Sequence, residues 1–138
     1  MPNQARSQES TRKITLLGSS DLLLKLILFS YETTRYEQVL VGYAPRHAAE
    51  TMPNKLTYEE NLYALKNKYK NIRLLKLDNL DEPGYSELCD SELQISIGSA
   101  WIYRQRHIDL APLLVHPHCT DLPRYRGGAS VSWMIMSK

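Results

Sequence analysis

The sequence has little cysteine, little net charge and no long apolar stretch. Two cysteines among 138 residues, Cys89 and Cys119, are too few for a disulfide framework and fit a reducing cytoplasm. The formal net charge of +2 is too small to indicate a nucleic-acid-binding protein. The longest apolar run, Leu22 to Phe29, is interrupted by Lys25 and is too short to span a bilayer. The first twelve residues are polar and do not form a secretion signal, so we expect a cytoplasmic protein without membrane contact.

The length and composition of the chain are those of one ordinary globular domain. Hydrophobic residues make up 43% of the chain and charged residues 23%, which is typical of a soluble domain with a modest core. Residues 1–12 bury nothing, and we expect them to form a disordered tail. Residues 13–138 are expected to form the domain.

Apolar runs of strand length alternate with helical patterns along the domain. The strands are predicted at residues 13–18, 38–44, 72–77, 93–98 and 113–116. Helices are predicted at residues 22–30, after caps at 19–21, and from a capping box at Thr57 and Glu60, with Tyr58, Leu62, Leu65 and Tyr69 on one face. A last helix is predicted at residues 129–136. This alternation favours an α/β fold with a parallel sheet covered on both faces.

The reactive side chains are concentrated between the fifth strand and the last helix. Residues 116–128 read His-Pro-His-Cys-Thr-Asp-Leu-Pro-Arg-Tyr-Arg-Gly-Gly and combine two imidazoles, a thiol, a hydroxyl and two guanidinium groups. A polar loop between a buried strand and a helix is typical of a site at the carboxyl edge of a parallel sheet.

This loop resembles the active-site loop of the formyltransferases that use 10-formyltetrahydrofolate. The pattern of that family reads Asn-x-His-x-Ser-x-Leu-Pro-x-Tyr-Arg-Gly, and its Leu-Pro and Arg-Gly steps fall on Leu122-Pro123 and Arg126-Gly127. The spacing then puts the catalytic His of the family on His118 and its Ser on Thr120, whereas its Asn is replaced by His116. The resemblance covers roughly residues 13–138 and is strongest from residue 95 onward.

The resemblance implies a Rossmann-like, doubly wound parallel sheet and a formyl transfer to an amine. The cosubstrate would be 10-formyltetrahydrofolate, and the reaction would pass through a tetrahedral oxyanion intermediate. His118 would be the hydrogen-bond donor and proton carrier, with His116 and Thr120 beside it. The residues implied to bind the folate are Ser99, Trp101, Ile102, Tyr103, Leu122 and Pro123, and those implied to bind the substrate are Arg126 and Gly127.

The acceptor is expected to be a small-molecule amine. A sugar amine is slightly preferred over methionyl-tRNA, because no basic face studded with aromatic residues is evident, and a glycinamide nucleotide is a further candidate.

The chain departs from the family at its end. The family has an Asp, several tens of residues beyond the His, that orients the imidazole, and this sequence ends at Lys138 before that position. We therefore expect the C-terminal part of the domain to be missing. The apolar residues Trp133 to Met136 would then favour self-association. The alternative function is a non-catalytic remnant that binds a ligand or partner.

Other interpretations of these residues lead to different chemistry. His107, His116, His118 and Cys119 could ligate zinc, but His118 and Cys119 point apart on an extended chain, so no metal is predicted. Cys119 is either a nucleophile or a buried thiol. Either Arg124 and Arg126 clamp a phosphate on the substrate, or Arg126 braces the loop by bonding backbone carbonyls. The aromatic residues at the end of the fourth strand, Trp101 and Tyr103, either stack on a pterin or belong to the core.

Overall fold

A computed structural model of the chain describes residues 11–33, 35–46, 55–99, 101–118, 124 and 136. Its described residues form an α/β fold in which five parallel strands make one sheet, as predicted. The elements are β1 (Lys13–Gly18), α1 (Asp21–Glu32), β2 (Gln38–Tyr43), α3 (Lys55–Lys68), β3 (Ile72–Lys76), α4 (Gly84–Leu88), β4 (Leu93–Ile97), α5 (Gln105–Leu110) and β5 (Leu114–Val115).

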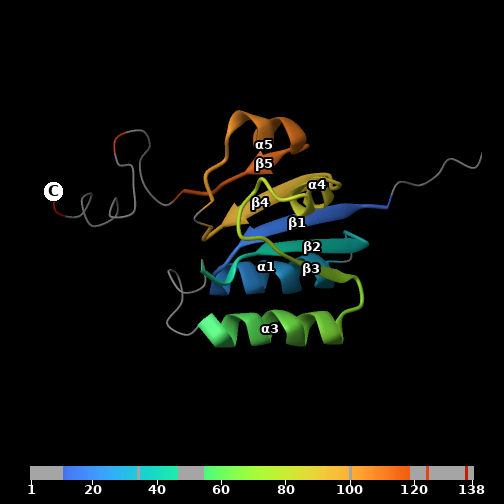
Figure 1. Ribbon diagram of the computed structural model, residues 1–138. Coiled ribbons are helices and arrows are strands. Elements are labelled where there is room, and N and C mark those ends of the chain that lie inside the picture. Colours follow the sequence, from blue (N-terminus) through green and yellow to red (C-terminus); the bar gives the residue numbers. More distant parts are fainter. Residues whose placement is uncertain are drawn as a thin grey trace, which may run out of the picture.

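The sheet has the strand order β3-β2-β1-β4-β5 (Figure 1). The chain begins in the middle with β1, proceeds through β2 to β3 at one edge, and then crosses to β4 on the other side of β1. β5 pairs only with β4 among the described strands, so it lies at the opposite edge.

Helices cover both faces of the sheet. α1 and α3 lie on one face, and α4 and α5 lie on the other (Figure 1). The central strand β1 is buried on both sides, which is why its sequence is mostly apolar and shows no alternating polar face; its one buried polar side chain, Thr15, donates a hydrogen bond to the Leu88 carbonyl. Leu16 of β1 belongs to the core under α1 and α3, and its neighbour Leu17 belongs to the core on the α4 side.

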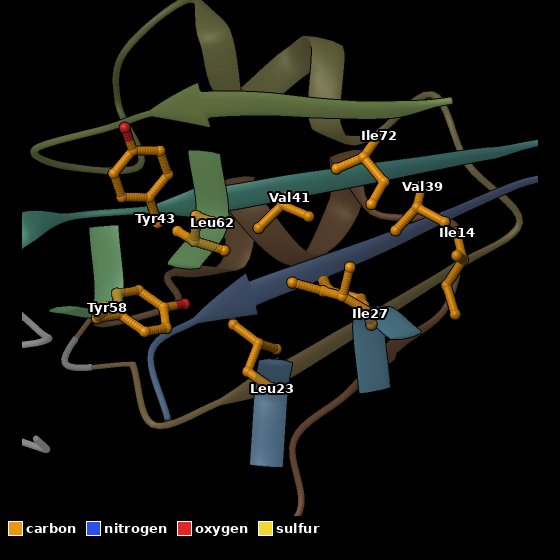
Figure 2. Close-up of a cluster of buried hydrophobic side chains, with 10 residues drawn as sticks. Ile14, Leu23, Ile27, Val39, Val41, Tyr43, Tyr58, Leu62 and Ile72 are labelled. Carbon is orange, nitrogen blue, oxygen red and sulfur yellow. The ribbon is translucent and has the colours of Figure 1, made fainter. Parts of the chain in front are cut away.

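The core between the sheet and the helices α1 and α3 is built from aliphatic and aromatic side chains (Figure 2). The helical face predicted from the sequence is confirmed, because Tyr58 and Leu62 are fully buried in it. Leu65 and Tyr69 pack against the same core and are partly buried. Each fully buried aliphatic side chain of this kind contributes about 1.5–3 kcal/mol of hydrophobic stabilisation.

One helix start differs from the prediction, and one helix was not predicted. The N-cap of α1 is Ser20, as expected, and its hydroxyl accepts a hydrogen bond from the Leu23 amide at 3.0 Å. α3 begins at Lys55, two residues before Thr57, so the predicted capping box with Thr57 at the N-cap is wrong. The helix α5 was not predicted, because its six residues are mostly polar.

Arg12, the last residue of the segment expected to be a tail, is attached to the sheet. Its carbonyl oxygen accepts hydrogen bonds from the amides of Glu37 and Gln38, and its guanidinium forms an ion pair with Glu92 at 3.0 Å. Residues 1–10 and nearly all of the predicted helix 129–136, including Trp133, lie outside the described residues. None of the described helices is long and apolar enough to cross a membrane.

Candidate functional site

Because the strands are parallel, the loops that follow them lie together at the carboxyl edge of the sheet. The loop after β1 leads to α1 on one face, whereas the loop after β4 leads to α5 on the other face. Such a divergence between two adjacent parallel strands is where open α/β sheets bind their ligands. The candidate site is therefore defined by the loops after β1, β4 and β5.

Two glycines hold the loops after β1 and β4 in direct contact. Gly18 has φ 116° and Gly98 has φ 64°, so both adopt backbone conformations that other residues rarely occupy. The Ser19 amide donates to the Ile97 carbonyl at 3.1 Å, and the Ser19 hydroxyl donates to the Gly98 carbonyl at 3.2 Å. The two loops thus form one bonded unit at the centre of the edge.

A hydroxyl network then connects the end of β4 with the segment that precedes α5. The Tyr103 hydroxyl donates to the Ser96 hydroxyl at 3.0 Å, and the Ser96 and Ser99 hydroxyl oxygens are 2.9 Å apart. Burial raises the pKa of Tyr103, so its phenol stays protonated at neutral pH. The network therefore fixes Ser99 and Tyr103, two residues implied to bind the folate.

His116 and His118 follow the carboxyl end of β5. The register of β5 on β4 pairs Gln94 with Leu114 and Ile95 with Val115, so both histidines lie at the same edge as Ser99 and Tyr103. The imidazole of His116 is 6.5 Å from the Tyr103 ring, centroid to centroid. His116 and His118 are both exposed, so a ligand from solvent can reach these two side chains.

The remaining residues of the expected site divide into two groups. Trp101 is only 7% exposed and belongs to the core on the α4 side, whereas Ile102 is 80% exposed. The other predicted site residues lie outside the described residues: Thr120, Leu122, Pro123, Arg126 and Gly127.

The sequence did not reveal that one buried histidine, His107, forms a hydrogen-bonded cluster with Asp81 and Arg106 next to this edge. His107 of α5 is 4% exposed, and its Nδ1 accepts a hydrogen bond from the Arg104 amide at 3.1 Å. Nε2 therefore carries the proton and donates to the Asp81 carboxylate at 2.7 Å. Arg106 donates to the same oxygen at 2.9 and 2.6 Å. These bonds, His107 first, hold the pKa of Asp81 below its usual value.

In the part of the chain that the structure describes, no group of three or more His, Cys, Asp and Glu residues is arranged to hold a metal ion. His107 is committed to Asp81 and to the backbone, so its ring is engaged in packing α5 against the loop after β3. No protein-family model, curated protein or solved structure matches the chain.

The Tyr103 hydroxyl makes a testable contribution to the order of this edge. Replacing Tyr103 by phenylalanine is expected to lower the free energy of unfolding by about 1 kcal/mol, because it deletes the hydrogen bond to Ser96 and leaves the ring in place. Urea unfolding measures the effect. Tyr36→Phe is the control, since Tyr36 is partly buried and its ring faces the Arg12 guanidinium. Equal losses in both variants would contradict a specific role of the network.

Proposed function

We propose that the chain is a Rossmann-like, doubly wound domain that transfers a formyl group from 10-formyltetrahydrofolate to a small-molecule amine. The strand order β3-β2-β1-β4-β5 supports this fold, because it corresponds to five of the six strands of a dinucleotide-binding sheet. The observation that carries the function is that the loop with His116 and His118 meets the β4 loop at one sheet edge.

The proposed role of His118 follows from the chemistry of imidazole. The amine would attack the formyl carbon of the bound donor. The tetrahedral intermediate would then collapse by breaking the bond between this carbon and N10 of the folate, and N10 would take up the proton that the amine has lost. A neutral imidazole N–H can donate to the oxygen on which negative charge develops, and its other nitrogen can accept the proton that the amine loses. His118 is exposed at the edge, as such a group must be before substrate binds. His116 is the second donor, in the position where the family has Asn.

The described part of the site fits an aromatic donor. Ile102 presents an apolar side chain that is 80% exposed, and an aromatic ring of the donor could cover it. Tyr103 and Ser99 hold this segment in place through the hydroxyl network.

The test is a formyl-transfer assay with 10-formyltetrahydrofolate and a panel of amines. His118→Ala is expected to lower kcat/KM by about 100-fold or more, because removal of an oxyanion donor or a proton carrier has effects of this size. Circular dichroism verifies that the variant is folded. His116→Asn, which introduces the residue of the family pattern, is expected to retain or raise kcat.

Two outcomes would contradict the proposal. Full activity in His118→Ala would exclude the role given to this histidine. A wild-type chain that binds the folate but transfers no formyl group to any amine would favour the alternative of a ligand-binding remnant. Arg35→Gln serves as a matched surface control, since Arg35 lines a groove beside α1 that is remote in sequence from these loops.

A further inference from the structure

A polar cavity lies at the carboxyl edge, apart from the two exposed histidines. It encloses about 220 Å³ and is formed by the segments that follow β2, β3 and β4. Arg46 lines it from the first segment, Asn79 and Asp81 from the second, and Trp101 and Arg104 from the third. Its volume suits one anionic group or a small ring rather than a whole cofactor.

The acidic side chain in this cavity is engaged through one of its two carboxylate oxygens. The Asp81 oxygen Oδ1 accepts hydrogen bonds from Arg106 at 2.9 and 2.6 Å and from His107 at 2.7 Å. Because Arg106 compensates the charge of Asp81, these two residues together contribute no net charge to the cavity. His107 uses both ring nitrogens in bonds within the protein and is neutral in this arrangement.

The uncompensated charge comes from two arginines. Among the described residues, the ion pairs of the arginines involve Arg12, Arg73 and Arg106, and no carboxylate pairs with Arg46 or Arg104. Each guanidinium has five N–H donors in a planar fork that matches the oxygens of a carboxylate or a phosphate. Arg46 and Arg104 line the same cavity beside the buried side chain of Trp101, and together they make it positively charged.

We propose that this cavity binds the oxyanion of a small-molecule ligand, a carboxylate or a phosphate, between the guanidinium groups of Arg46 and Arg104. Charge-assisted, bidentate hydrogen bonds to arginine are among the strongest polar contacts that proteins make. Trp101 and Leu80 add apolar side chains to the lining of the cavity. This proposal does not depend on formyl transfer, because the two arginines that would hold the oxyanion differ from the histidines of the β5 loop. The cavity does share Ile102 with the surface proposed for the donor ring.

Trp101 provides the signal for a binding experiment. The chain has two tryptophans, so Trp133→Phe leaves Trp101 as the single reporter. In this background, fluorescence is titrated with inorganic phosphate and, separately, with glutarate, at ionic strength held constant with chloride. A saturable change with phosphate indicates a phosphate ligand, and one with glutarate indicates a carboxylate ligand. The absence of a saturable change with both anions would overturn the proposal.

Single substitutions then locate the bound anion. Arg46→Gln and Arg104→Gln are each expected to raise the Kd about tenfold or more, since each removes one charged fork. Both side chains are exposed and lack ion pairs among the described residues, so the variants should keep the wild-type circular dichroism spectrum. The control is Arg35→Gln, which makes the same change in net charge beside α1. An equal loss of affinity in Arg35→Gln would show an unspecific charge effect and overturn the proposal.

Discussion

Replacing Gly18 by alanine is expected to lower the free energy of unfolding by about 3 kcal/mol or more. A Cβ on Gly18 would lie 2.0 Å from the Ile97 carbonyl oxygen and 3.0 Å from the Ser99 amide nitrogen, so backbone rather than side chain would have to move. The φ of 116° adds strain of about 1–3 kcal/mol for a residue with a side chain. Overpacking of this kind adds a further ~1–3 kcal/mol.

Gly98 is the reciprocal half of the same contact. A Cβ there would lie 2.0 Å from the Ser19 carbonyl oxygen, and its φ of 64° is also positive. Gly98→Ala is therefore expected to be similarly destabilising. Because a small domain has a free energy of unfolding of about 5–15 kcal/mol, each substitution removes a large fraction of it.

Gly84→Ala is the matched control for these two substitutions. Gly84 opens α4 and has no positive φ, and a Cβ there would meet only the ends of two side chains, Leu77 at 2.9 Å and Leu75 at 3.7 Å. That methyl group can move aside, and alanine favours the helix, so a change within about 1 kcal/mol is expected. Urea unfolding followed by circular dichroism measures all three variants. A loss in Gly18→Ala no greater than that in Gly84→Ala would contradict the account of the loop contact.

The sheet could be predicted because its strands are buried on both faces. Residues of β1 and β2 are apolar almost without interruption, and the helical face of α3 repeats at regular spacing. The carboxyl edge then follows from parallel pairing alone, so the position of His116 and His118 after β5 was accessible from the sequence. The strand order could not be predicted from the sequence, because a central strand and the strands beside it have the same apolar pattern.

The polar elements at the edge could not be predicted for a different reason. α5 has a polar sequence and a single buried residue, His107, whose partner Asp81 lies 26 residues earlier in the chain. The start of α3 was placed three residues too late, at Tyr58 instead of Lys55, because Thr57 and Glu60 satisfy the capping-box pattern inside the helix. Local patterns report local structure, whereas the cavity of Arg46 and Arg104 is assembled from three separate segments.

Replacing His107 by alanine is expected to lower the free energy of unfolding by about 2–4 kcal/mol. The substitution empties a buried site next to the Tyr85 ring, whose centroid is 5.6 Å from the imidazole, and it removes the acceptor for the Arg104 amide. It also removes the Nε2 donor to Asp81, which joins α5 to the loop after β3. Since α5 leads directly into β5, loss of this anchor should also loosen the segment that carries His116.

Two substitutions that each keep one polar group of His107 separate the contributions of its two hydrogen bonds to stability. Asn at position 107 can keep an acceptor near the place of Nδ1, and Gln can keep a donor near the place of Nε2, so His107→Asn and His107→Gln should each be less destabilising than His107→Ala. Urea unfolding at neutral pH ranks the three variants. The same loss in all three would indicate that packing against Tyr85, and not hydrogen bonding, accounts for the contribution of His107.

The free energy of unfolding, measured as a function of pH in the acid range, tests the contribution of Asp81 to the same cluster. The hydrogen bonds from His107 and Arg106 lower the pKa of Asp81 in the folded protein, so its charge stabilises the fold fully above its ordinary pKa of about 3.9. This stabilisation is lost as the pH falls through the lowered pKa. Asp81→Asn should therefore be less stable than wild type at neutral pH, and the two curves should converge at the acid end. A constant difference down to that end would show that the charge of Asp81 contributes nothing to the anchoring of α5.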